Sequence, residues 1–141
     1  MNLKKNTLLS LSLLALGSII TPINADFNDG WIAFTSEDFK TAAKEWTPLA
    51  EKGDAKAQTN LGILYFNGKG VLKDYKKAVT WLKEAAVQGE DEAQFILGKL
   101  YLEGEGVPQS FKTAKYWVKQ AYDANFDGAE DLWENYQLWK Y

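Results

Sequence analysis

Apolar residues between positions 57 and 88 recur at helical spacing in two stretches. Residues 57–67 include small or apolar residues at 57, 61, 62, 64, 65 and 66, and residues 74–88 include them at 75, 78, 79, 81, 82, 85, 86 and 87. Spacings of three and four residues are typical of helices that bury one face. Gly68-Lys69-Gly70 predicts a turn between the helices, and no stretch shows the sustained alternation of a strand. The pattern therefore predicts a pair of helices.

The same pattern returns 36 residues later, so the chain contains an internal repeat. The same shift backwards relates Ala78 to Ala42 and Gly89 to Gly53, which places a shorter unit in front. We predict two full units, 54–89 and 90–125. The residues that recur in register are expected to be structural: Gly62, Tyr65, Gly68, Gly70, Ala78 and Trp81 in the first unit, and Gly98, Tyr101, Gly104, Gly106, Ala114 and Trp117 in the second.

Two of these repeated positions have a predicted packing role. Gly62 and Gly98 are expected on the inner face of the first helix of each unit, where the absence of a side chain lets the second helix approach closely. A glycine costs about 1 kcal/mol of helix propensity, so the close packing has to return more. Trp81 and Trp117 are predicted to fill the gap toward the following unit.

Both ends of the repeat array depart from the 36-residue unit. The leading segment 26–53 is predicted to form helices at about 26–34 and 37–51, joined by a turn four residues shorter than in the full units. Pro48 lies inside the second of these helices and predicts a kink or an early end. The segment 126–141 continues the register without the glycine and tyrosine of a full unit, and we predict that it is a capping helix.

The repeated motif resembles a known family. Residues 57–89 contain Ala-x-x-x-Leu-Gly-x-Leu-Tyr-x-x-Gly-x-Gly-Val, then Lys-x-Ala-x-x-Trp, then Ala-Ala-x-x-Gly, and residues 93–121 repeat this order. The motif strongly resembles the Sel1-like repeat, a relative of the tetratricopeptide repeat, and the leading segment resembles an ordinary tetratricopeptide unit. The resemblance implies an all-α fold, a short right-handed α-solenoid of stacked antiparallel helix pairs. It covers nearly all of 26–141.

The second unit departs from the first at two helix boundaries. Ser110 stands where the first unit has Asp74, and Asn125 stands where it has Gly89. Serine can still cap the start of a helix, and asparagine tolerates the left-handed conformation that follows a helix end. We therefore expect both units to fold alike.

The first 25 residues have the pattern of a signal peptide. Lys4 and Lys5 precede an apolar run at 8–20, which is short of the roughly 20 residues that a membrane span needs. Pro22 ends the run, and Ala25 offers a small residue for cleavage. The expectation is export, to the periplasm of a Gram-negative bacterium by the family resemblance, with secretion as the alternative. An uncleaved signal anchor is the rival interpretation of this segment.

The composition removes most catalytic chemistry. The chain has 16 Lys+Arg, all of them lysine, against 19 Asp+Glu, with a net charge of −3 and neither His nor Cys. Nucleophilic Cys/His or Ser/His/Asp sites and zinc sites built on His or Cys are excluded. An acidic chain without arginine also lacks the features of a nucleic-acid binder. We expect no enzyme activity, no catalytic residue, no cofactor, no metal, no nucleic-acid partner and no membrane insertion after signal cleavage.

Two acidic clusters are candidate sites. Asp123-x-Asn125-x-Asp127-Gly128, followed after five residues by Glu134, matches the pattern of a calcium-binding loop. The repeat register instead makes 123–128 a turn between helices, and a helix beginning near 127 cannot wrap around an ion. The second cluster, 90–92, is interpreted as favourable negative charge at a helix N-terminus.

The resemblance also indicates where a partner would bind. In related stacks the first helices of the pairs line an inner, concave face, and most of the corresponding residues here are apolar, which is typical of a partner surface. The alternative is that neighbouring units or the tail cover this face. The expected concave-face residues are Trp31, Phe34, Thr59, Ile63, Phe66, Phe95, Lys99 and Leu102.

These observations favour a protein that recognises another protein or a peptide segment, as an envelope scaffold or regulator. One alternative is a periplasmic immunity protein or inhibitor that neutralises a toxin. A further alternative is an enzyme acting on the cell wall or on β-lactams, because some exported Sel1-like proteins have been associated with that chemistry. Those relatives carry paired cysteines in each unit, and this chain has none.

Overall fold

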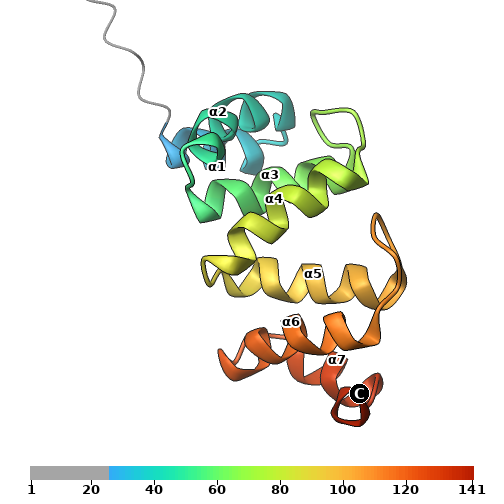
Figure 1. Cartoon of the computed structure of the whole chain (residues 1–141). Helices are drawn as coiled ribbons and strands as arrows, with labels where there is room; N and C mark the ends of the chain where they lie inside the picture. Colours follow the sequence, from blue (N-terminus) through green and yellow to red (C-terminus); the bar gives the residue numbers. More distant parts are fainter. Residues whose placement is uncertain (1–25) are drawn as a thin grey trace, which may run out of the picture.

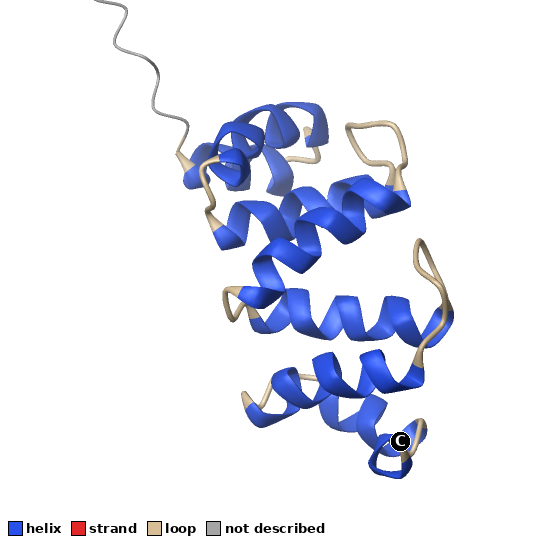
Figure 2. Cartoon of the chain, in the orientation of Figure 1, coloured by secondary structure: helices blue, strands red, loops and turns tan. Residues whose placement is uncertain are grey.

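The computed structural model describes residues 26–141, and the predicted signal peptide at 1–25 lies outside this range. Its secondary structure consists of helices joined by turns, with no strand among the described residues (Figure 2). None of these helices is long and apolar enough to cross a lipid bilayer. The elements are α1 (Phe27–Thr35), α2 (Phe39–Glu51), α3 (Ala55–Asn67), α4 (Tyr75–Val87), α5 (Asp91–Glu103), α6 (Phe111–Asp123), α7 (Ala129–Asn135) and a 3-10 helix (Leu138–Lys140).

The helices form a stack of antiparallel pairs. α1 packs with α2, α3 with α4 and α5 with α6, and the second helix of each pair packs against the first helix of the next. Figure 1 shows this order as a gradual change of colour along the stack. α7 and the 3-10 helix close the end of the array against α6. The prediction of an all-α solenoid is confirmed.

Helix boundaries follow the predicted capping residues. Asp74 begins α4 by accepting a hydrogen bond from the Lys77 backbone N–H at 3.0 Å. Ser110 does the same for α6, accepting from the Thr113 N–H at 3.2 Å. Asn125 takes the left-handed conformation with φ 58°, in the place of Gly89 at φ 96°. Both departures of the second unit therefore preserve the local structure.

Each pair is held closely together by a glycine that faces a large side chain. A Cβ on Gly62 would lie 2.8 Å from Cγ of Leu82, and a Cβ on Gly98 would lie 2.6 Å from Cγ2 of Val118. The leading pair uses the same device, because Gly30 lies directly against the indole of Trp46. Trp46 is fully buried, and its Nε1 donates a hydrogen bond to the Phe27 carbonyl at 3.2 Å.

The glycine turns also join neighbouring pairs. A Cβ on Gly106 would lie 2.8 Å from Cβ of Tyr75, at the start of the second helix of the preceding pair. Gly70 makes the equivalent contact with the backbone of Phe39 and Lys40. The turns 68–74 and 104–110 are four residues longer than 36–38. The extra residues contact the preceding pair. The leading pair has no pair before it within the described residues, and its turn is shorter.

Three expectations about packing need correction. Trp81 packs on the core formed by α1, α2 and α3, and Trp117 packs on the core formed by α4 and α5. Both tryptophans therefore face the preceding pair and not the following one. Pro48 does not end α2 early, because the helix continues to Glu51. The tail forms two short helical segments instead of one capping helix, and it buries Leu138 completely.

Candidate functional site

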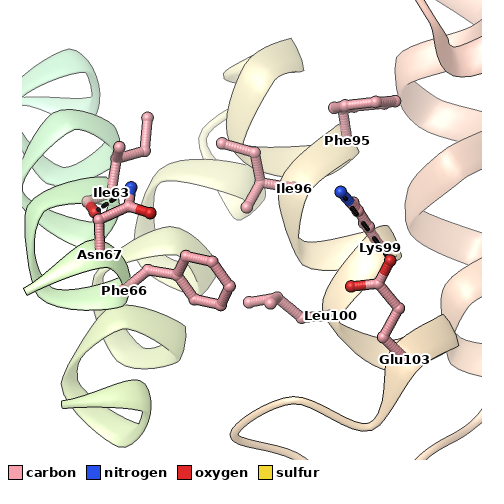
Figure 3. Close-up of a pocket in the computed structure, with 8 residues that line it drawn as sticks. All are labelled: Ile63, Phe66, Asn67, Phe95, Ile96, Lys99, Leu100 and Glu103. Carbon is pink, nitrogen blue, oxygen red and sulfur yellow. Dashed lines mark hydrogen bonds and ion pairs between the residues drawn. The ribbon is translucent and has the colours of Figure 1, made fainter. Parts of the chain in front are cut away.

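A groove opens between α3 and α5, the first helices of the two full pairs. Its hollow has a volume of about 220 Å³. Four of the expected concave-face residues line it: Ile63, Phe66, Phe95 and Lys99. The complete lining of what we call the α3–α5 groove is Ile63, Phe66, Asn67, Phe95, Ile96, Lys99, Leu100 and Glu103 (Figure 3).

Phe66 is the main aromatic surface of the groove. Its ring lies 5.2 Å from the ring of Tyr75, centroid to centroid, in a tilted arrangement. The ammonium of Lys73 lies 4.7 Å from the Tyr75 ring centroid and 6.0 Å from that of Phe66. These contacts hold Phe66 in place while leaving it half-buried, so the groove has a fixed apolar wall with a cation beside it.

Lys99 and Glu103 supply the charge in the groove. Their Nζ and Oε1 atoms are 3.8 Å apart, and both side chains are substantially exposed. An exposed pair of this kind, four residues apart on one helix, contributes little to stability. Either group can therefore exchange this contact for one with a partner at low cost. Figure 3 shows the pair at the edge of the apolar lining.

A second, more polar hollow of about 170 Å³ lies where the N-terminal ends of α3 and α5 meet α1. Trp31 is its largest exposed side chain, at 48 % exposure, and stacks on Phe34 with the ring centroids 5.7 Å apart. Glu92 lies in the same hollow, where desolvation and the nearby charge of Glu90 raise the pKa of its carboxyl group. The sequence predicts that the negative charge at 90–92 is favourable, but at Glu92 desolvation and the charge of Glu90 oppose ionisation.

Two expected concave-face residues are buried and cannot contact a partner. Leu102 is 1 % exposed because the tail folds back onto it and places Leu138 in the same core. Thr59 is 2 % exposed, and its hydroxyl donates to the Ala55 carbonyl of its own helix at 2.9 Å. Thr59 lines the polar hollow together with Trp31, but almost none of its own surface is exposed.

Two further residues are only partly available. Phe34 is half-buried and lies 5.6 Å from Trp46 and 5.4 Å from Phe39, centroid to centroid, so it belongs mainly to the core of the leading pair. Phe95 lines the groove, but Phe126 covers one side of it at 5.1 Å. The tail residue Phe126 therefore covers part of the expected concave face at Phe95 on α5.

Comparison with known families identifies the repeat. The model of the Sel1 repeat matches residues 55–90 and 91–126, which together make up half of the chain. The chain belongs to the Sel1 repeat family. The matched repeats begin one residue later than the units 54–89 and 90–125 inferred from the spacing alone. Sel1 repeats form a helical scaffold that generally mediates protein–protein interaction.

Solved structures of Sel1 repeat proteins are similar to the chain. A Sel1 repeat protein from Oxalobacter formigenes has a TM-score of 0.65 and 30 % identity, over 74 % of this chain and 46 % of that one. A protective antigen present in uropathogenic Escherichia coli strains, which displays an SLR fold, has a TM-score of 0.74 and 34 % identity, over 82 % of this chain and 25 % of that one. The chain thus spans less than half of either protein. No curated protein matches its sequence.

Sequence reasoning missed four residues of the groove between the Sel1 repeats: Asn67, Ile96, Leu100 and Glu103. The repeat spacing offered a signal, because Glu103 occupies the position of Asn67 one repeat later. A groove between two helices is lined by the exposed residues of each helix and also by residues that point partly into the core. Leu100, at 2 % exposure, is one of the latter.

The calcium-loop pattern lies in the turn that the repeat register predicts. α6 ends at Asp123 and α7 begins at Ala129, so helix replaces the second half of the loop. Asp123 forms an ion pair with Lys119 one turn earlier on α6. Within residues 26–141, no three acidic side chains gather in an arrangement that suits a metal ion.

The cap of α5 is a weak point of the second Sel1 repeat. Asp54 begins α3 by accepting a hydrogen bond from the Ala57 N–H at 2.8 Å, whereas Glu90 makes no such bond at the start of α5. We expect Glu90→Asp to restore the bond and raise the free energy of unfolding by about 0.5–1 kcal/mol. Chemical denaturation measures the change, with Glu90→Ala as the control. Equal stability of the two variants would show that the cap is not limiting.

Proposed function

We propose that this Sel1 repeat protein is exported and works without enzymatic chemistry, by binding a partner protein in the α3–α5 groove. The observation that carries the proposal is the groove itself, with the apolar surfaces of Ile63 and Phe66 beside the weakly paired Lys99. The fitting partner element is an amphipathic or extended segment that inserts apolar side chains and brings an acidic group to Lys99.

The rigidity of the scaffold supports binding by the groove. Its walls are two helices, each packed along its length against a second helix of its own pair. A surface that is already ordered loses little conformational entropy when a partner binds, so a larger part of the contact energy remains as affinity. Apolar burial at about 25 cal/mol per Å² supplies the main driving force for a groove of this kind.

Export to the periplasm is part of the same proposal. It is supported by the lysines, the apolar run and the small residue at the end of 1–25. Mass spectrometry of the intact protein recovered from the periplasm tests it. The expected N-terminus is Asp26, and a chain that keeps Met1 and stays in the membrane fraction would contradict it.

Two double substitutions test the groove, one inside it and one on α4 outside it. We expect Ile63→Asp together with Lys99→Glu to abolish capture of partner proteins from a periplasmic extract, because the pair removes the apolar surface and reverses the charge. Thr80→Asp with Lys83→Glu makes the same change in charge at exposed positions on α4 and should leave capture intact. Equal capture by both variants, with melting temperatures unchanged, would overturn the proposal.

A further inference from the structure

A hollow of about 280 Å³ lies between the end of α4, the start of α5 and α6, away from the α3–α5 groove. Every residue that lines it is uncharged, although a quarter of the chain is charged. Val87 and Tyr116 border it and are 66 % and 58 % exposed. The lining that matters for the argument is Val87, Gln88, Gln94, Tyr116, Trp117 and Gln120.

Gln94 lines this hollow and has a buried, unpaired acceptor. The residue is 7 % exposed, and its Nε2 donates to the Ala86 carbonyl at 3.1 Å. That bond fixes the orientation of the amide. Its Oε1 is buried and has no hydrogen-bond partner among the described residues. A buried acceptor without a partner costs free energy, so this position favours an incoming N–H or O–H group.

The preceding repeat shows which group satisfies the same position. Gln58, which precedes Gln94 by one repeat, is 3 % exposed and donates its Nε2 to the Ala50 carbonyl at 3.0 Å. Its Oε1 accepts a hydrogen bond from Nε2 of Gln88 at 2.7 Å, so a carboxamide completes the site. The second repeat has Ala124 at the position of Gln88, and alanine has no group to donate.

We propose that this hollow is a second binding site, which takes the carboxamide side chain of a glutamine or asparagine from a partner protein. The incoming NH₂ group donates to Oε1 of Gln94, as Gln88 does to Gln58. Gln120 replaces Glu84 of the preceding repeat and offers an amide N–H to the incoming carbonyl. No lining charge balances a carboxylate, so glutamate and aspartate are rejected.

The surroundings of the hollow specify the rest of the partner segment. The exposed side chains of Val87 and Tyr116 place apolar surface beside the amide position. The segment therefore presents apolar residues next to its glutamine or asparagine. The hollow shares no lining residue with the α3–α5 groove, so a partner bound there leaves the groove open.

The test is a nuclear magnetic resonance titration of the full chain with three capped peptides, acetyl-Ser-Leu-Gln-Leu-Ser-amide and its counterparts with Glu or Met in the centre. We expect the Gln peptide to shift the side-chain NH₂ signals of Gln94 and Gln120 and to bind at least tenfold more tightly than the other two. The Ala124→Gln variant supplies the missing donor from within the chain, so it should lose this binding at least tenfold.

Two results would overturn the proposal. One is equal binding of the three peptides, and the other is the absence of any shift at Gln94 and Gln120 with the Gln peptide. The Ile63→Asp and Lys99→Glu groove variant should bind the Gln peptide as the natural chain does. The outcome at this site is therefore separate from the outcome for the proposed groove.

Discussion

Gly70→Ala should destabilise the fold strongly, by about 3 kcal/mol or more in the free energy of unfolding. Gly70 has φ 71°, where an L side chain is strained by about 1–2 kcal/mol. An added Cβ would also lie about 2.5 Å from the Lys40 backbone N and closer still to the Phe39 carbonyl group. Backbone atoms cannot move aside as side chains do, so the turn would separate from α2. Urea denaturation of the full chain measures the loss.

Gly89→Ala is the matched control for this substitution. Gly89 also has a positive φ, of 96°, but a Cβ there would have no atom within 4 Å. This variant should carry only the conformational cost, about 1–2 kcal/mol. Similar losses for the two variants would mean that the turn does not fasten one pair to the next.

Gly98→Leu should largely unfold the chain, with a loss of about 3 kcal/mol or more, at the upper end of the cost of overpacking. The first added atom would lie 2.6 Å from Cγ2 of Val118 and 3.1 Å from its backbone N. Val118 is fully buried, so it has nowhere to move unless α5 and α6 separate. Thermal unfolding followed by far-ultraviolet circular dichroism measures the effect. A melting temperature near that of the natural chain would refute the predicted contact.

A double substitution tests whether Val118 is the cause. Gly98→Ala alone should be destabilising because of the contact with Cγ2 of Val118, and Val118→Ala removes that atom. The two changes together should cost clearly less than the sum of the separate costs, since the second relieves the clash made by the first. Additive losses would place the constraint elsewhere.

The repeat could be predicted from the sequence because its constraints are local. Gly62 and Gly98 are required wherever the facing helix comes close, and Asp74 and Ser110 begin helices through their own backbone neighbours. Such requirements recur at the repeat spacing and leave a visible pattern. The pairing of helices and their boundaries followed from that pattern with small differences.

The parts that could not be predicted depend on contacts between units. The direction of Trp81 and Trp117 and the reach of Gly70 over Phe39 depend on how one pair is placed on the next. Spacing along one unit does not contain that information.

The tail misled the site prediction for a related reason. Leu102 occupies the position of Phe66 one repeat later, so periodicity assigns both residues to the same face. Phe66 borders the groove, whereas Leu102 is covered by the tail and Leu138, which follow no repeat. A terminal segment that caps the array thus changes the exposure of residues that the repeat treats as equivalent.

Site-specific photo-crosslinking tests the central claim most directly, because it reports which face of the array contacts a partner. The photoreactive residue p-benzoylphenylalanine would replace Lys99 in the groove or, as the control, Thr80 on the exposed side of α4. Our account predicts a discrete crosslinked protein from position 99 in intact cells and none from position 80. Crosslinking from position 80 alone, or equally from both positions, would contradict it.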